Sequence, residues 1–162
     1  MSPKQWKRPP RGVVDTSVLV ASVAGFRDDP PRTPSALLLR DWCDSPTFVW
    51  LITDQILEEY VEVLTRLNVR GAARIVRLIA EEAEYVQATA EMSGFPHEPD
   101  VHFAECAESG NADFLVTLNK KHFPQDRLSA RVIAPSDPLP RQRAVRRRRV
   151  ARLVTRTARP RK

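Results

Sequence analysis

Short apolar segments alternate with amphipathic segments along most of this 162-residue chain. GVVD (12–15), TFVWLIT (47–53), ADFLVT (112–117) and RVIA (131–134) have the length and the β-branched and aromatic content of buried strands. Helical patterns separate most of them. This alternation is typical of α/β proteins, in which crossover helices join parallel strands. We therefore expect an α/β fold with a parallel, doubly wound sheet.

The segment 54–68 has the clearest helical pattern. Its apolar side chains recur at helical spacing, and Thr53 or Asp54 can cap its first turn. The predicted inward face consists of Ile56, Tyr60, Val63, Leu64 and Leu67. Further helices are expected at 16–25, 35–45, 73–86 and 100–110, with a short strand near 85–89.

Charge is distributed unevenly along the chain. The formal net charge is +6, but 11 of the 26 Lys and Arg residues lie in 141–162, where no acidic residue occurs. The remaining 15 basic residues stand against 20 acidic ones. We expect a flexible N-terminus (1–10), a mildly acidic domain (11–138) and an Arg-rich tail (139–162) that is disordered or partly helical.

The sequence predicts neither a membrane segment nor a disulfide framework. No apolar run approaches the roughly 20 residues that span a bilayer, and residues 1–10 lack the apolar region of a signal peptide. Cys43 and Cys106 occur in helical patterns, which favours reduced, packed thiols. We expect a cytoplasmic protein without a membrane partner.

Asp15 interrupts the apolar stretch RGVVDTSVLVASV. Burying an ionised carboxylate among apolar side chains without a partner costs on the order of several kcal/mol of folding free energy, because the charge loses its hydration. Its partner could be a helix N-terminus, a basic residue or a metal ion. Capping of the helix that begins at Thr16 is an equally good interpretation of Asp15 alone.

Other polar residues follow strand ends. Thr16 and Ser17 come just beyond Asp15, and Thr117 and Asn119 lie at and beyond the end of the strand 112–117. In an open parallel sheet ligands bind beyond the carboxyl ends of the strands, so we expect these side chains to gather with Asp15 at one edge. Taken alone, Thr117 and Asn119 could be simple turn formers.

Two helical carboxylates are predicted to face the same region. Glu59 lies at the flank of the apolar face of its helix, and Asp100 projects on the same side as Phe103 at a helix N-terminus. Each has an ordinary alternative, as a solvated helix residue or as a residue favoured by the helix dipole. Carboxylates gathered in one pocket repel each other, and Mg²⁺ or Mn²⁺ bound to their oxygens would remove that repulsion.

The segments VVDTSVLVAS, TDQILEEY and PDVHFAECAESGNADFLVTLNKKHF, in this order, resemble a PIN-domain ribonuclease, in particular the VapC-type and related toxins of bacterial toxin–antitoxin pairs. The resemblance covers about residues 11–135. It implies a three-layer α/β/α sandwich and an acidic site for Mg²⁺ or Mn²⁺. The implied catalytic set is Asp15, Glu59, Asp100 and Asn119, with Ser17 and Thr117 in support and with Asp15 and Asp100 as metal ligands.

Two positions depart from the pattern of that family. Ser17 stands where Asn is frequent, and Asn119 stands where Asp is frequent. A neutral Asn119 would hold a second metal weakly, so we expect one firmly bound ion. His97, His102 and His122 are poorly spaced for a zinc site and are predicted to lie in loops or on the surface, with His102 directed away from the apolar face of its helix.

The expected reaction is metal-dependent endonucleolytic hydrolysis of RNA. RNA, an antitoxin protein and a second copy of the chain are the expected partners; the dimer rests on the resemblance and on the apolar content of residues 34–80. The run Arg146, Arg147, Arg148 and Arg149 could contact RNA phosphates or remain solvated. A non-catalytic nucleic-acid- or partner-binding module and a receiver-like domain stay open as alternatives. A haloacid dehalogenase-type phosphatase is disfavoured, since it would need Asp at position 17.

Overall fold

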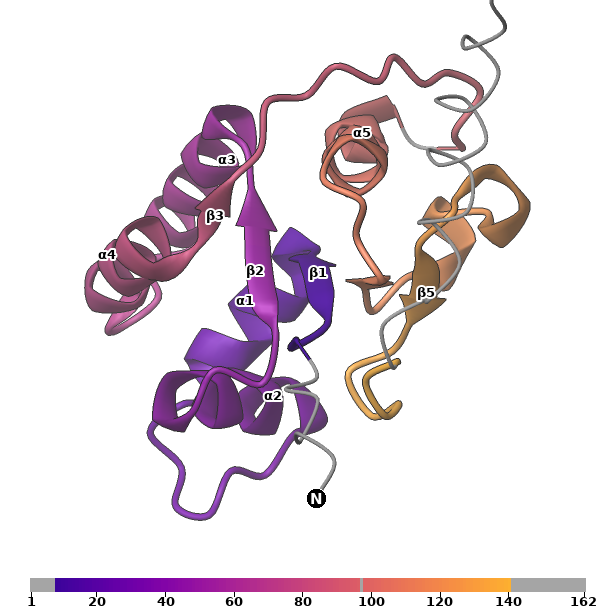
Figure 1. Ribbon diagram of the computed structural model, residues 1–162. Helices are drawn as coiled ribbons and strands as arrows, with labels where there is room; N and C mark the ends of the chain where they lie inside the picture. The colour runs from indigo at the N-terminus through magenta and orange to yellow at the C-terminus, as the bar shows by residue number, and fades with distance from the viewer. Residues whose placement is uncertain (1–7, 97, 141–162) are drawn as a thin grey trace, which may run out of the picture.

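Five parallel strands form the centre of the molecule (Figure 1). The structure, a computed structural model, describes residues 8–96 and 98–140. The strands are β1 (Arg11–Val14), β2 (Val49–Ile52), β3 (Glu84–Tyr85), β4 (Phe114–Val116) and β5 (Arg131–Ile133), in the order β3-β2-β1-β4-β5. The predicted α/β class and parallel sheet are confirmed. Our expectations for residues 1–7, His97 and the tail from 141 onward, Arg146–Arg149 included, fall outside the described residues.

Helices cover both faces of the sheet. They are α1 (Thr16–Ala24), α2 (Pro34–Asp44), α3 (Asp54–Arg66), α4 (Ala72–Glu82) and α5 (Val101–Ser109). The chain runs outward from β1 to β2 and β3 through α1–α4, and then returns through α5 to β4 on the other side of β1. Because parallel crossovers are right-handed, outward and returning connections place their helices on opposite faces. Figure 1 shows α5 across the strands from α3 and α4, as expected for a three-layer arrangement.

Helix α3 begins and packs largely as its sequence predicts. The Thr53 hydroxyl accepts a hydrogen bond from the amide of Ile56 at 3.1 Å, which confirms Thr53 as the N-cap. Ile56, Tyr60 and Leu64 are buried. Leu67 is 52% exposed, so its assignment to the inward face was wrong. The reason is that α3 ends at Arg66 and Leu67 is already its C-cap residue.

Tyr60 fixes α3 against the end of β1. Its ring is fully buried, and its hydroxyl donates a hydrogen bond of 2.5 Å to the carbonyl oxygen of Val14. The indole of Trp50 donates to the same hydroxyl at 3.4 Å. Val14 immediately precedes Asp15, and Glu59 immediately precedes Tyr60. This buried contact therefore brings the two acidic residues to the same end of the sheet.

The strand order reverses between β1 and β4. The chain moves from β1 in one direction to β2 and β3, and then crosses back to β4, which pairs with β1 on its other side. Open α/β sheets bind ligands at such a switch point. The observed order also differs from the 2-1-3-4-5 order of receiver domains, so the receiver-like alternative is wrong.

The described residues also test the membrane and cysteine predictions. Within 8–96 and 98–140, no helix has the length and apolar character needed to cross a membrane. Cys43 and Cys106 are both free thiols, as predicted. Burial raises the pKa of Cys106 to about 12, which keeps this thiol protonated and unreactive.

Gly12 in β1 supplies a test of the packing between neighbouring strands. A Cβ at this position would overlap the buried ring of Phe114, its register partner in β4. We expect Gly12→Ala to lower the free energy of unfolding by about 1–3 kcal/mol, the usual cost of overpacking. In a Phe114→Leu background the same substitution should cost clearly less, and urea denaturation measures both differences. Equal costs in the two backgrounds would contradict this account.

Candidate active site

Asp15 lies at the carboxyl end of β1 and is only 5% exposed. Its Oδ2 accepts hydrogen bonds from the Ser17 hydroxyl at 2.7 Å and from the Thr117 hydroxyl at 2.8 Å. It occupies the N-cap position of α1 but makes no side-chain capping bond, so the simple capping interpretation does not hold. Burial raises the pKa of Asp15, the two hydroxyl bonds oppose this effect, and the negative charge of Asp100 adds to it.

Thr117 connects Asp15 to the end of β4. Its side chain is fully buried, and its hydroxyl oxygen also accepts the backbone amide of Asn119 at 2.9 Å. The Ser17 hydroxyl oxygen accepts the amide of Leu118 at 3.4 Å. These contacts tie the loop after β4 to the start of α1, so the structure brings Asp15, Ser17 and Thr117 together as predicted. The side chain of Asn119 is exposed beside them and makes no hydrogen bond to another described residue.

Glu59 on α3 reaches the same edge through Thr16. The Thr16 hydroxyl donates to Glu59 Oε1 at 2.8 Å, and the imidazole Nε2 of His102 lies against Glu59 Oε2. Burial alone would raise the pKa of Glu59. The hydrogen bonds from His102 and Thr16, together with the attraction of His102, outweigh burial, so this pKa lies below its ordinary value.

Asp100 is the N-cap residue of α5 and ends the short 3₁₀ turn Glu98–Asp100. Its Oδ2 lies 2.9 Å from His122 Nδ1, and its side chain is 17% exposed. The helix N-terminus favours a negative charge here, as the sequence predicted. The influence of Asp100 on the pKa of Asp15 places both carboxylates within electrostatic range of each other.

Two histidines therefore belong to this site, although the sequence pattern predicted both of them to lie in loops or on the surface. The side chain of His102 is only 12% exposed, because α5 turns this side chain toward α3. His122 lies in the 3₁₀ turn Lys120–His122, immediately beyond Asn119. Hydrophobic periodicity cannot identify such residues, since each lies against a carboxylate from a distant part of the chain.

The side chains of the site suit a hard divalent cation. Asp15 and Asp100 offer carboxylate oxygens, and the hydroxyls of Ser17 and Thr117 both donate to Oδ2 of Asp15 and not to Oδ1. Within the described ranges, no three His, Cys, Asp or Glu side chains converge closely enough to hold a metal by themselves. Mg²⁺ commonly binds one or two carboxylates and keeps several waters, which this arrangement accommodates.

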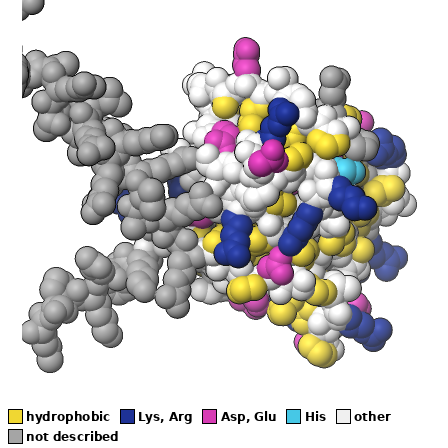
Figure 2. All heavy atoms as spheres, turned by 90° about the vertical axis from the view of Figure 1, so that its right-hand side faces the viewer, with side chains coloured by type: hydrophobic (Ala, Val, Ile, Leu, Met, Phe, Trp, Pro, Cys, Tyr) yellow, Lys and Arg dark blue, Asp and Glu magenta, His cyan; other side chains and the backbone are white. Residues whose placement is uncertain are grey.

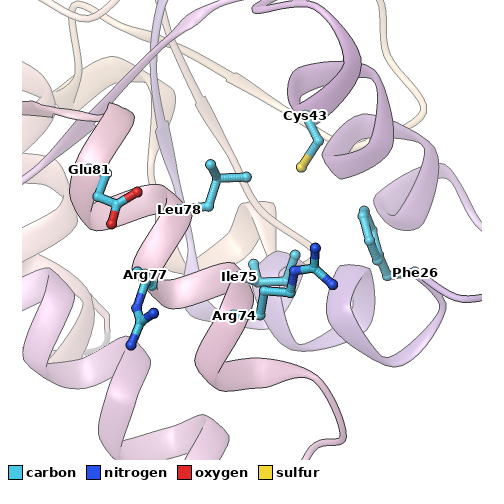
Figure 3. Close-up of a pocket in the computed structure, with 7 residues that line it drawn as sticks. All are labelled: Phe26, Cys43, Arg74, Ile75, Arg77, Leu78 and Glu81. Carbon is cyan, nitrogen blue, oxygen red and sulfur yellow. The ribbon is translucent and has the colours of Figure 1, made fainter.

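A cavity of about 560 Å³ lies away from these residues (Figure 3). It opens beside α4 and is lined by Phe26, Cys43, Arg74, Ile75, Arg77, Leu78 and Glu81. Its apolar surface includes Phe26 and Leu78, whereas Arg74 and Arg77 supply positive charge and form no ion pair with another described residue. None of the acidic residues at the ends of β1 and β4 lines this cavity.

The protein is an α/β protein whose parallel sheet carries acidic side chains at its switch point. Such a site is suited to a divalent cation. The family model of the PIN domain matches residues 11–121, and the chain therefore belongs to the PIN domain family. Members of this family are typically nucleases that use divalent metals. A search of curated proteins finds no match to the chain.

The burial of Asp15 predicts that its ionised form lowers the stability of the fold when no cation is present. Folding raises this pKa above its ordinary value near 3.8, so stability falls as pH rises through the folded pKa, and the penalty persists at neutral pH. Asp15→Asn can keep both hydroxyl bonds on one amide oxygen. We expect this variant in EDTA at pH 7 to gain on the order of 1 kcal/mol, roughly 2–4 °C in Tm.

The pH dependence provides the control for this measurement. Below the ordinary pKa, Asp15 is protonated in both the folded and the unfolded chain, so the advantage of the variant should shrink as pH falls. A thermal melting series from neutral to acidic pH measures it. A variant that is less stable than the wild type at pH 7 would contradict the assignment of a destabilising buried charge.

Proposed function

We propose that the protein is a metal-dependent endoribonuclease that hydrolyses phosphodiester bonds in single-stranded RNA or RNA loops of the cytoplasm. The observation that carries this proposal is the hydrogen bond between Thr117 and the buried Asp15 across the β1–β4 switch point, with Asp100 within electrostatic range. Membership of the PIN domain family supports the nuclease class. A buried, charge-destabilised carboxylate at a ligand-binding edge favours cation binding over a purely structural role.

In this proposal Asp15 and Asp100 hold one Mg²⁺ or Mn²⁺ ion. A bound ion of this kind lowers the pKa of a coordinated water and neutralises charge that develops on the phosphate. Ser17 and Thr117 fix the orientation of the Asp15 carboxylate through their hydroxyl bonds. Their role is to present one carboxylate geometry to the cation before it binds.

Glu59 and Asn119 complete the proposed set. Glu59 is held by the hydroxyl of Thr16 and would complete the cation's ligand shell or order its waters. The exposed amide of Asn119 can donate to a phosphate oxygen or accept from a water. Because this amide is neutral, it positions substrate without adding to the repulsion among the carboxylates.

A non-catalytic nucleic-acid- or partner-binding module with the same fold is the second candidate. One observation favours it: Glu59 and Asp100 each lie against a histidine and do not converge with Asp15. In the catalytic proposal Asp100 would share the cation with Asp15, and Glu59 would reach it directly or through coordinated waters. Cation-dependent cleavage of RNA separates the two candidates directly.

The catalytic proposal predicts RNA cleavage that EDTA abolishes and Mn²⁺ or Mg²⁺ restores. Asp15→Asn and Asp100→Asn should each lower kcat by more than about 100-fold, beyond the loss expected for an outer-shell partner of a metal. Glu58→Gln is the matched control, because Glu58 is an exposed acid on α3 and should leave the rate unchanged. Cleavage of a fluorescent RNA oligonucleotide measures these rates. Wild-type rates in both aspartate variants would exclude the proposed site.

The toxin of a toxin–antitoxin pair is the biological role we propose for this activity. The cavity beside α4 supports a protein partner, since its apolar surface and the charges of Arg74 and Arg77 fit a segment with apolar and acidic side chains. A neighbouring gene for a DNA-binding antitoxin would support this role. We also propose a homodimer, for which the exposed Val61 and Leu67 of the α3 region offer apolar surface.

We propose that the Arg-rich tail, with Arg146–Arg149 at its centre, contributes affinity for RNA. Outside residues 141–162 the chain has more acidic than basic residues. Figure 2 shows Lys and Arg side chains interspersed with Asp and Glu on the side of the molecule that carries β5. With this excess of acids, the chain outside 141–162 repels a polyanion at long range, whereas the tail holds 11 basic residues and no acid.

Truncation after Leu139 tests the contribution of the tail. We expect weaker RNA binding and a flatter dependence of log Kd on log salt, by about 0.7 for each phosphate of single-stranded RNA that the tail neutralises in the full chain. Turnover at saturating RNA should change little, since the proposed site lies within residues 15–119. Fluorescence anisotropy at several salt concentrations measures the affinity and its salt dependence. Unchanged affinity and slope would show that the tail does not bind RNA.

A further inference from the structure

Glu59 is held from two sides by residues of different elements. Thr16, the first residue of α1, donates to Oε1 at 2.8 Å, and His102 on α5 presents Nε2 to Oε2. The Glu59 side chain is 28% exposed and that of His102 is 12% exposed. The imidazole also packs on the ring of the neighbouring Phe103, with ring centroids 4.3 Å apart. Phe103 is fully buried, so this packing anchors the imidazole.

We propose that His102 is a positioning residue, which together with Thr16 holds the Glu59 carboxylate in one orientation at the edge of the sheet that carries Asp15. This inference rests on the proposed function, in which Glu59 serves the cation or its waters. It adds a role for a histidine that the acidic set by itself does not include.

The physical argument concerns the freedom of a glutamate side chain. Glu59 has a long, flexible side chain, and fixing such a chain at the moment of cation or substrate binding costs conformational entropy. Contacts made in advance by Thr16 and His102 reduce that cost. Outer-shell partners that orient a carboxylate have this effect in metal sites, and their loss typically costs 10–100-fold in affinity or activity.

The placement of His102 argues for action through Glu59 and against direct contact with RNA. Its side chain has little exposed surface, and its Nε2 faces the carboxylate. The contact also joins α3 to α5, helices that belong to different layers of the molecule. His102 therefore sets the position of Glu59 relative to Asp100, which begins the helix that carries His102.

A matched pair of substitutions tests the proposal. His102→Gln keeps an N–H donor near the position of Nε2, whereas His102→Met has similar size and no donor. The first readout is the Kd for Mn²⁺ without RNA, from electron paramagnetic resonance titration. We expect His102→Met to weaken Mn²⁺ binding by about 10-fold or more and His102→Gln to recover most of that loss. Circular dichroism melting checks that both variants fold.

The second readout is the kinetics of RNA cleavage. A positioning role predicts that His102→Met lowers kcat while the KM for RNA stays near the wild-type value. In a Glu59→Gln background, His102→Met should cost little more, because its effect passes through the carboxylate. Wild-type Mn²⁺ affinity and kcat in His102→Met, or fully additive losses in the double variant, would overturn the proposal.

These readouts separate the positioning role from the proposed function. If the wild type binds Mn²⁺ but cleaves no RNA, the ribonuclease proposal fails. The Mn²⁺ affinities of His102→Met and His102→Gln then still decide the role of His102. If the wild type does not bind Mn²⁺, both proposals are overturned.

Discussion

A buried carboxylate at the end of β1 is the constraint on which the site depends. Asp15 lies among apolar strands, and its charge needs donors that the strand itself cannot supply. Ser17 and Thr117 provide them, one from the first turn of α1 and one from the end of β4. The second donor requires β4 to lie beside β1 in the observed register. The strand order and the placement of the carboxylate are therefore coupled.

The other carboxylates of the site also have partners from distant parts of the chain. Glu59 lies against Thr16 and His102, and Asp100 lies against His122. Like charges near one another raise the free energy of the ionised site, and hydrogen-bond donors lower it. A carboxylate oxygen that accepts one hydrogen bond keeps a second lone pair for a cation or a water. The affinity of the site for metal thus depends on how these donors orient the carboxylates.

Local sequence patterns predicted the strands, the helices and the acidic residues, because each depends on near neighbours in the chain. The phase of α3 follows from apolar spacing, and its start follows from the Thr53 cap. The same reasoning failed at Leu67, where the helix had already ended. It also extended the predicted helix 73–86 over β3, whereas α4 ends at Glu82. Helix and strand ends depend on tertiary contacts that spacing does not record.

The sequence by itself determined the α/β class and the gathering of Asp15, Ser17 and Thr117 at one edge, since residues after parallel strands share that edge whatever the details of packing. Only the tertiary structure decided that His102 and His122 lie against Glu59 and Asp100. The reason is physical: hydrophobic periodicity shows which helix face enters an apolar core. This periodicity does not show which polar side chains a second element will cover, because contacts such as His102 with Glu59 join residues far apart in the chain.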